Sequence, residues 1–379
     1  MKNYLPKQYE STENLEINHN YLKLQFDDYE EIFSKIKNVV INGDYTLGAE
    51  VDLLEREFSK LCDVKHSIAV GSGTDAIFLS LKALGIGAGD EVITTAFTFY
   101  ATIGAIATTG AKPVFCDIKD DYNIDPKEIK KKISSKTKAI VPVHWSGRPC
   151  EMDEIMFISN KYNIPIISDS CHAIKAQYKN ISLGALGLSS CYSFHPLKNL
   201  NVWGDGGIIA TNSDTLSDKL RLIRNHGLVN RDECVEFAYN SRLDTIQAVV
   251  ARHLLNKIDF ITNSRVNNAN YFDKNLREIK QIKIPNRDKD LFEVFHIYSI
   301  TCQHRNELVK YLINNGVDAK IHYPTAMHLQ PAASYLNYQK GDFINAELIS
   351  SSVLSLPVHE FINKEQQDKV ISLIKNFYS

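Results

Sequence analysis

The chain has 379 residues, of which 44% are hydrophobic, and this length predicts about two globular domains. Its 43 basic residues nearly balance its 45 acidic residues, so the net charge of −2 provides no overall field that would attract nucleic acid or an anionic membrane. No stretch approaches the ~20 apolar residues of a membrane span and the first ten residues lack the apolar core of a signal peptide, so we expect a cytoplasmic protein.

Short apolar runs alternate with helical patterns along the first part of the chain. The strands predicted in this way cover residues 67–70, 91–95, 113–117, 138–144, 164–168, 189–194 and 207–211. Such alternation is typical of a doubly wound α/β sheet. After the first of these strands, Ile77, Leu81 and Leu84 recur at helical spacing, and the glycines in 85–89 suit a left-handed helix end.

The C-terminal part has a different pattern. Residues 243–279 are mostly helical in pattern, after which we expect strands over 292–302 and 317–323 and a helix over 305–315. We therefore predict a large domain over residues 1–250, beginning with a loosely held polar arm, and a smaller domain over residues 251–379.

One glycine-rich segment lies between a predicted strand and a predicted helix. Its backbone N–H groups and the hydroxyls of Ser72 and Thr74, on either side of Gly73, could bind a phosphate at the positive end of the helix. The same residues also fit an ordinary N-cap turn, so both interpretations stay open. The glycines at 85–89 follow a helix and precede a strand, which is the reverse of the order in a dinucleotide-binding fingerprint, and we reject that interpretation.

Three further residues follow predicted strands. Asp169 stands at the carboxyl end of a strand, where open α/β sheets bind their ligands, and His172 follows it. Lys198 lies in a later loop, where Pro196 fixes a turn. Taken singly, these residues also fit a turn cap, a buried structural histidine and a solvated surface charge. Together with the phosphate segment they supply a Schiff-base amine, a carboxylate for a pyridinium nitrogen and a phosphate site, which are the parts that hold pyridoxal phosphate (PLP).

The seven cysteines include no Cys-x-x-Cys pair. We therefore expect reduced thiols rather than a disulfide framework or a zinc site, and we expect no metal.

The ordered motifs resemble the DegT/DnrJ/StrS family of sugar aminotransferases, which have the aspartate-aminotransferase fold (PLP-dependent transferase fold type I). The resemblance runs from about residue 20 to the C-terminus. The matching segments are Gly43-Asp-Tyr-Thr-Leu-Gly48, Ser72-Gly-Thr74, Phe97-Thr-Phe99, Pro142-Val-His144, Asp169 with His172, Ser193-Phe-x-x-x-Lys198, Gly204-Asp-Gly-Gly207, Asn240-Ser-Arg242 and His322-Tyr-Pro324 with His328. The resemblance implies an α/β large domain with a mostly parallel seven-stranded sheet and a smaller C-terminal α/β domain.

The resemblance also implies roles for single residues. Lys198 would form the Schiff base with the cofactor, Asp169 would pair with the pyridine nitrogen, and Phe99 would stack on the ring. The side chains and amides that would bind the phosphate are those of Ser72, Gly73, Thr74 and Ser193. His172 would lie near the phenolic oxygen of the cofactor. Asn240 would reach the phosphate of the neighbouring subunit's cofactor, which implies a homodimer with composite active sites.

The implied reaction moves an amino group from L-glutamate to a nucleotide-linked keto-deoxysugar during the biosynthesis of amino sugars for polysaccharides. The segment 43–48 favours a dTDP-linked 3-keto-6-deoxyhexose. Related dehydratases carry histidine at the position of Lys198, which argues against their reaction. A 4-keto-sugar nucleotide or a cyclitol ketone stays open as the substrate, and a non-enzymatic PLP-binding regulator stays open as the function. The loop side chains that would line a sugar pocket, each of which also fits a structural role, are Trp145, Arg148, His195, Trp203, His322 and His328.

Overall fold

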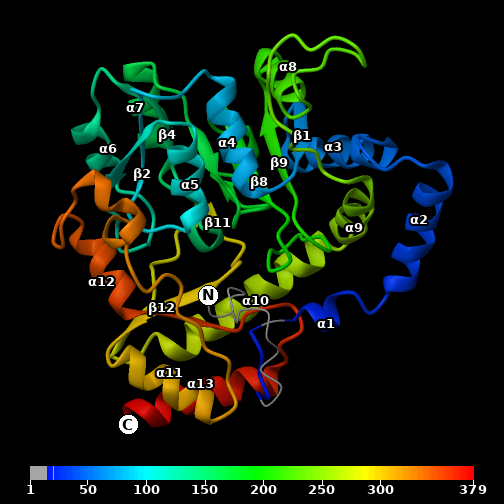
Figure 1. The fold of residues 1–379 in the computed structure, drawn as a ribbon. Coiled ribbons are helices and arrows are strands. Elements are labelled where there is room, and N and C mark those ends of the chain that lie inside the picture. The colour runs from blue at the N-terminus through cyan, green and yellow to red at the C-terminus, as the bar shows by residue number, and fades with distance from the viewer. Residues whose placement is uncertain (1–14, 20) are drawn as a thin grey trace.

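The centre of the large domain contains the seven strands that the sequence predicts (Figure 1). The computed structural model describes residues 15–19 and 21–379, so the predicted N-terminal arm lies almost entirely outside the described residues. The seven strands are β1 (His66–Val70), β2 (Glu91–Thr95), β3 (Lys112–Cys116), β4 (Thr137–Val141), β5 (Ile167–Asp169), β8 (Ser189–Ser193) and β9 (Gly207–Thr211). Each overlaps a predicted strand, although β4 and β5 are shorter than predicted.

These strands form two hydrogen-bonded sheets that meet edge to edge. One sheet has the order β1-β9-β8-β5 and the other has the order β3-β2-β4. Isolated parallel bridges at Ile140–Ile166 and Val143–Asp169 join β4 to β5. The pairs β2–β3, β2–β4 and β5–β8 are parallel, whereas β9 runs antiparallel to both of its neighbours. The predicted α/β fold class is confirmed.

Helices cover both faces of this sheet system. Because side chains alternate along a strand, Ile68 and Val70 of β1 enter one core while Ala69 enters another. The core around Ile68 also contains residues of α4 (Gly73–Ala83), α5 (Tyr100–Thr108) and α8 (Asp214–Ile223). The core around Ala69 contains residues of α2 (Tyr29–Asn42), α3 (Ala49–Cys62) and α9 (Thr245–Leu255). Further cover comes from α6 (Pro126–Lys132) and α7 (Met152–Tyr162).

Helix α4 begins and ends as predicted. Ser72 is its N-cap residue and accepts a hydrogen bond from the backbone N–H of Asp75 at 3.0 Å. Ile77 and Leu81 are fully buried. The helix ends at Ala83, and Gly85 follows with φ +73°, a left-handed conformation that a residue with a side chain rarely adopts.

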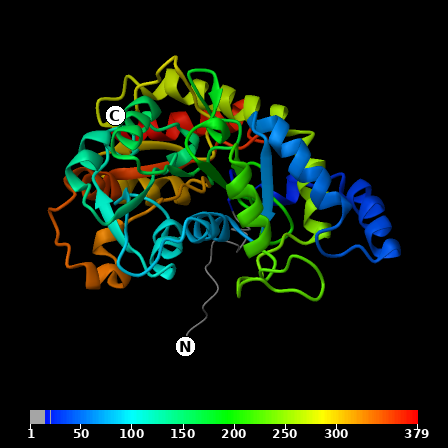
Figure 2. The same cartoon turned by 90° about the horizontal axis from the view of Figure 1, so that it is seen from above.

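The small domain lies below the sheets in Figure 1 and is formed mainly by C-terminal residues. Its helices and strands are α10 (Ile258–Leu276), β10 (Ile282–Lys283), β12 (Tyr298–Cys302), α11 (Arg305–Asn314), β13 (Val353–Leu356) and α13 (Lys364–Tyr378). The other elements are α1 (Leu22–Gln25), η2 (Trp145–Gly147), β6 (Gln177–Tyr178), β7 (Ile181–Ser182), η3 (Leu183–Ala185), β11 (Leu291–Phe292), η4 (Met327–Leu329), η5 (Pro331–Leu336) and α12 (Ile344–Ser352). Viewed from above, α10 and α13 lie along the back of the molecule (Figure 2).

Two strand predictions for the small domain need correction. The strand predicted over 317–323 is wrong, because this segment divides its pairing between two partners through isolated bridges, Ile17–Val317 and Lys320–Ser355. The strand predicted over 292–302 is two strands, β11 and β12, separated by an irregular stretch in which Phe295 has φ +47°. That stretch bonds to η2 instead of to a neighbouring strand, since the N–H of Val294 donates to the Gly147 carbonyl at 3.1 Å.

Packing changes from one domain core to the other along α10. Ile258 and Ile261 pack in the core of α2, α3 and α9, whereas Ala269 and Phe272 pack in the core of the small domain. The boundary predicted at residue 251 stays a prediction. In the part of the chain that the structure describes, no helix is both long and apolar enough to cross a membrane, and the cytoplasmic location likewise stays a prediction.

Candidate active site

The predicted phosphate segment lies at the start of α4, beside the first strand. Gly73 and Thr74 occupy the first two helical positions, where backbone N–H groups have no acceptor within the helix. The N–H of Gly71 donates to the Ser241 hydroxyl at 3.1 Å, and this hydroxyl donates to the Asp75 carboxylate at 2.8 Å. Free amides at the positive end of a helix form a cradle that suits an anion.

Two glycines allow other chain segments to approach this cradle closely. A Cβ atom on Gly73 would lie 2.6 Å from Cβ of Ser193, and one on Gly207 would lie 2.3 Å from the carbonyl oxygen of Ser72. The start of β9 and the end of β8 therefore pack directly against the cradle. Cys171 also reaches it, because its Sγ would be 3.0 Å from a Cβ on Gly73. The segment that follows β5 thus meets the phosphate cradle.

Asp169 ends β5 and is buried, with 6% of its surface exposed. Its Oδ2 accepts a hydrogen bond from the Thr102 hydroxyl at 2.7 Å, and its Oδ1 accepts one from the N–H of Cys171 at 3.1 Å. Thr98 lies behind Thr102, with 2.7 Å between their hydroxyls. These contacts fix the orientation of the carboxylate at the carboxyl end of the sheet.

Lys198 lies in the loop between β8 and β9 and is partly buried. The loop closes on itself, since the N–H of Lys198 donates to the His195 carbonyl at 2.8 Å and the N–H of Val202 donates to the Phe194 carbonyl at 2.9 Å. Burial lowers the pKa of the Lys198 amine, while Cys171 and Asp169 act in the opposite direction. An amine in this position is held toward its neutral, nucleophilic form.

His172 and His296 form a pair beside this lysine. Their ring centroids are 4.4 Å apart. Burial lowers the pKa of His172 well below its ordinary value, and the charge of Lys198 adds to the effect. The backbone N–H of Ser146 points at Nδ1 of His172 at 3.2 Å, so Nδ1 is the acceptor. A neutral His172 therefore carries its proton on Nε2, where it can be donated.

Aromatic side chains form one wall near the lysine. Phe99 precedes α5 and is 47% exposed, with its ring centroid 5.8 Å from that of Tyr323. Burial raises the pKa of the Tyr323 hydroxyl, and Asp169 adds to the effect, so the carboxylate and the phenol are close enough to interact. The large exposed area of Phe99 leaves a ring face available for stacking.

The predicted sugar-contacting residues fall into two groups. His195 and His322 lie near Lys198, whose charge contributes with burial to lowering the pKa of both rings, that of His322 to about 4. Trp145 is buried 6.3 Å from the Tyr323 ring, between centroids. The other predicted residues have separate surroundings: Trp203 packs on Phe26 and Phe33, His328 bonds to Glu347, and Arg148 pairs with Glu293 and Asp121.

Asn240 is exposed and bridges to Asn225 at the base of the loop that follows α8. Its neighbour Ser241 contacts the phosphate cradle of the same chain, as described above. The structure therefore places the 240–241 segment beside the cradle within one chain. The predicted reach of Asn240 to a second subunit stays a prediction.

Sequence reasoning missed three contributors to the site. Thr102 orients Asp169 from a helix that the sequence did not single out. His296 comes from the irregular stretch between β11 and β12, which had been predicted as strand. Tyr323 stood within the matched His322-Tyr-Pro324 segment, so that motif was the available signal.

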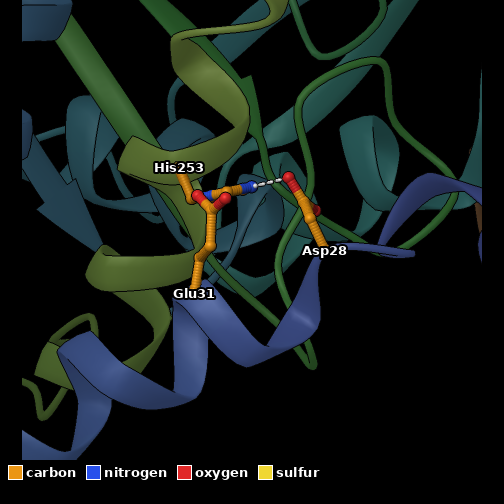
Figure 3. Close-up of side chains that lie close together, drawn as sticks. All are labelled: Asp28, Glu31 and His253. Atoms are coloured by element: carbon orange, nitrogen blue, oxygen red, sulfur yellow. Dashed lines mark hydrogen bonds and ion pairs between the residues drawn. The ribbon is translucent and has the colours of Figure 1, made fainter.

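A second group of ionisable side chains lies between α2 and α9 (Figure 3). Asp28, Glu31 and His253 place their ligand-type atoms within 4.8 Å of one another. The imidazole of His253 is 2.9 Å from the Asp28 carboxylate, which also pairs with the ammonium of Lys257. Burial opposes the charged form, but Lys257 and His253 lower the pKa of Asp28. Because Lys257 already supplies a cation, we interpret Asp28, His253 and Lys257 as a polar network that ties the start of α2 to α9 and the residues after it.

The main site fits pyridoxal phosphate. The cradle offers backbone amides to a phosphate, and a Cβ on Gly73 or Gly207 would collide with the segments that form it. Asp169 is an oriented carboxylate for a ring nitrogen, and Lys198 is an amine whose pKa is lowered. These donors match the phosphate, the pyridinium and the aldehyde carbon of the cofactor.

Comparisons with known proteins give concordant matches. The model of the DegT/DnrJ/EryC1/StrS aminotransferase family matches residues 27–375. The chain is 39% identical over 351 residues to a pleiotropic regulatory protein of Geobacillus stearothermophilus, covering 92% of this chain and 94% of the relative. It is 37% identical over 350 residues to the dTDP-3-amino-3,6-dideoxy-alpha-D-galactopyranose transaminase of Aneurinibacillus thermoaerophilus, covering 92% and 95%. The crystal structure of Streptomyces venezuelae DesV matches with a TM-score of 0.94 at 33% identity, over 96% of this chain and 98% of that chain.

Proposed function

The chain belongs to the DegT/DnrJ/EryC1/StrS aminotransferase family, and from this premise we propose that it transfers an amino group from L-glutamate to the keto group of a nucleotide-linked deoxysugar. The family's enzymes are PLP-dependent sugar aminotransferases. A dTDP-linked 3-keto-6-deoxyhexose is our first candidate for the acceptor, since segment 43–48 favours it and the Aneurinibacillus relative is named for a 3-amino sugar on dTDP.

The observation that carries the proposal is that Lys198 lies close enough to Asp169, at the carboxyl end of the sheet, for the carboxylate to act on the pKa of the amine. A lysine with a lowered pKa beside an oriented carboxylate is rare on a protein surface, where lysines are solvated. Cys171 lies between these groups and the phosphate cradle, because its N–H donates to Asp169, its pKa responds to the charge of Lys198, and its thiol reaches Gly73. A lysine with a purely structural role would not need to be buried beside an oriented carboxylate and a phosphate cradle.

We assign each step to residues of the chain. When bound, PLP supplies a sink for the electrons that remain after the amino donor loses its α-proton. Lys198 would hold the cofactor covalently and, when its amine is free, would move the proton as base and then as acid. Asp169 would keep the pyridine nitrogen protonated, and Phe99 would stack on the ring. His172 donates from Nε2 toward the phenolic oxygen, because its Nδ1 accepts from Ser146.

We further propose that the active species is a homodimer. Three large apolar side chains of the loop after α8, Val229, Val235 and Phe237, are exposed, and the Phe237 side chain is fully so at 104%. In Figure 1 this loop and α2 project away from the sheets at the top and right. Helix α2 adds Phe33 and Ile41, which are 51% and 69% exposed. Apolar groups in such numbers favour cover by a second subunit.

Half-reactions test the substrate. The enzyme is first converted to the amino form of its cofactor with L-glutamate, and the excess is removed. Each ketone is then offered while the absorbance of the starting form is followed. We expect a dTDP-linked 3-keto-6-deoxyhexose to restore it faster than a 4-keto-sugar nucleotide or a cyclitol ketone. If only cyclitol ketones restore the absorbance, the sugar-nucleotide assignment fails and the aminotransferase assignment survives.

A regulatory function is the second candidate, favoured by the name of the Geobacillus relative. A regulator that only binds the cofactor would not consume an amino donor. The purified protein should be yellow and should lose this colour when L-glutamate is added. A yellow protein whose colour persists with every donor would support regulation instead.

A further inference from the structure

A chain of buried polar side chains reaches the backbone carbonyl of Lys198. The Asn201 amide donates to the Lys198 carbonyl at 2.8 Å and also to Oε1 of Gln25 at 2.6 Å. The amide nitrogen of Gln25 donates to Oε1 of Glu360 at 3.1 Å, and Oε2 of Glu360 pairs with the Arg265 guanidinium at 3.1 Å. We call these four residues, Asn201, Gln25, Glu360 and Arg265, the buried polar chain.

A tyrosine connects the two ends of the buried polar chain. The hydroxyl of Tyr21 donates to the Lys198 carbonyl at 3.3 Å, so this oxygen accepts two hydrogen bonds. The Arg265 guanidinium lies 4.9 Å from the centre of the Tyr21 ring. Arg265 also donates to the carbonyls of Phe295 and His296, both at 3.3 Å. Hence one arginine contacts Tyr21, Glu360 and the backbone of the histidine that packs on His172.

The members of the buried polar chain are almost completely removed from water. Gln25 and Asn201 are 3% and 0% exposed, and the side chains of Arg265 and Glu360 are 2% and 1% exposed. Burying an ion pair carries a large desolvation cost, and apolar residues of similar size often stabilise a fold as well or better. A polar arrangement of this kind is therefore poorly explained by stability alone, whereas it fixes geometry in a way that apolar packing cannot.

Gln25 belongs to an N-terminal segment that is held at both ends. Before it, the N–H of Ile17 donates to the Gly316 carbonyl at 2.9 Å in the small domain. After it, Asp28 bonds to His253 and Lys257, as Figure 3 shows for His253. The segment thus runs from the small domain to the large one, and its residues Tyr21 and Gln25 contact the lysine loop.

We propose that the buried polar chain is a positioning device for Lys198, in which Gln25 transmits the docking of the small domain to the lysine backbone. Two hydrogen bonds to one carbonyl fix the orientation of the peptide group, and this orientation sets the direction in which the Lys198 side chain leaves the loop. Glu360 and Arg265 hold Gln25 only when the small domain is in place. This inference rests on the proposed role of Lys198, and none of the four residues touches the reacting atoms.

The test replaces Gln25 by methionine, which keeps its length and removes both hydrogen bonds. Gln367→Met is the matched control, because Gln367 is 5% exposed and its side-chain amide donates to the Asn268 carbonyl in the small domain. In the holoenzyme we expect Gln25→Met to speed amide hydrogen exchange in residues 194–202, to shift the pH profile of the cofactor absorbance, and to lower kcat about 10²-fold with little change in KM. Gln367→Met should lose stability without these effects.

If Gln25→Met folds poorly, a milder variant, Tyr21→Phe, tests the same proposal. Tyr21→Phe removes one of the two bonds to the Lys198 carbonyl and keeps the ring on Arg265, so it should shift the same readouts in the same direction by less. The positioning role is overturned if loop exchange and pH profile in both variants match those of Gln367→Met. A wild-type protein that forms no covalent link to PLP would refute the proposed function instead, while hydrogen exchange would still report whether Gln25 holds the loop.

Discussion

Lys198 is a charged side chain in surroundings that disfavour its charge. Burial lowers its pKa, and the nearby Asp169 and Cys171 only partly oppose this. Burying the charged amine destabilises the cofactor-free protein, but the same burial makes Lys198 reactive. An amine must lose its proton before it can attack a carbonyl carbon. Three neighbouring imidazoles lie in similarly apolar surroundings, since burial also lowers the pKa of His172, His296 and His322.

Lys198→Ala should abolish both the visible absorbance of the bound cofactor and transamination, because it removes the amine that we assign to the Schiff base. The fold should persist, since the change removes a loop side chain that is only partly buried. Borohydride reduction of the wild type followed by peptide mapping locates the modified lysine. Lys175→Ala and Lys179→Ala serve as controls on nearby lysines, and a label on either of those residues would refute the assignment.

The lowered pKa of Lys198 also predicts a pH-dependent stability difference. A cation whose pKa is lower in the folded protein than in the unfolded chain destabilises the fold at low pH, and this penalty disappears as pH rises through the folded pKa toward the unfolded one. The cofactor-free Lys198→Met variant should therefore unfold at a higher temperature than the cofactor-free wild type near neutral pH. The two midpoints should converge at alkaline pH, and a gap that stays constant with pH would contradict a buried ammonium.

Asp169→Asn should bind the cofactor but lose activity by roughly 10²–10³-fold, the scale of losing one preorganised electrostatic contact. The amide can still accept from Thr102, yet it no longer favours a protonated ring nitrogen. Single-turnover kinetics with L-glutamate measure the loss. Asp125→Asn is a suitable control. Asp125 likewise accepts a hydrogen bond from a backbone N–H, that of Lys127 at 2.9 Å, but it caps α6 and is not part of the candidate site. Near-normal turnover in Asp169→Asn would rule out its role.

At the level of single residues, the sequence singles out a candidate only where its residue type is informative in its local context. Lys198 and Asp169 stood out because a loop lysine and a strand-end carboxylate occurred with a glycine-rich helix start. Thr102, Gln25 and Asn201 did not, because a threonine or an amide carries no signal until its partners are known. Trp203 was predicted as a loop aromatic and His328 as part of a matched segment, but Trp203 packs on Phe26 and His328 bonds to Glu347.

Among the structural elements, β9 begins at a position that has no room for a side chain, since Gly207 lies directly against the phosphate cradle. Gly207→Ala would put a methyl group 2.3 Å from the Ser72 carbonyl oxygen and 2.8 Å from the N–H nitrogen of Gly73. We expect weaker cofactor binding and a loss of roughly 1–3 kcal/mol in unfolding free energy from overpacking. Cofactor titration and thermal unfolding measure the two effects.

Gly104→Ala provides the control for this variant, because it also adds one methyl group and a Cβ on Gly104 would meet nothing within 4 Å. Gly104 lies inside α5, where alanine is favoured over glycine, so this variant should be neutral or slightly stabilising. If Gly207→Ala binds the cofactor as tightly as Gly104→Ala does, the cradle is not as rigid as the contacts indicate.

Most elements of the large domain were predictable because each has a local signal. Buried parallel strands are short apolar runs, and α4 has both a serine N-cap and a glycine after its end. The small domain was less predictable, since its backbone pairing is divided among distant segments. Residues 317–323 look like a strand by composition, but their partners are Ile17 and Ser355, which no local pattern identifies.

For the whole molecule, the strongest prediction concerns assembly. If Asn240 serves the partner's phosphate, mixing inactive Lys198→Ala with inactive Asn240→Asp should restore about a quarter of the wild-type activity, because random exchange makes half of the dimers hybrids with one intact site each. Asn230→Asp, in the same exposed loop, is the matched control and should be active without mixing.

Ser241 contacts the cradle of its own chain, so Asn240 could instead serve the phosphate of its own subunit. If Asn240 serves the phosphate of its own chain, every hybrid site carries one of the two defects. No activity would then return, even with subunit exchange demonstrated by mass spectrometry.

The bond between Gln25 and Glu360 joins residues separated by 335 positions in the sequence. During synthesis the chain leaves the ribosome from its N-terminus, so Lys198 emerges long before Glu360 exists. The sheets and the phosphate cradle can form on the nascent chain, but the support behind the lysine must wait for release of nearly the last residues. A nascent or truncated chain would thus expose an untethered amine, and competence for catalysis would be the last property that the growing protein acquires.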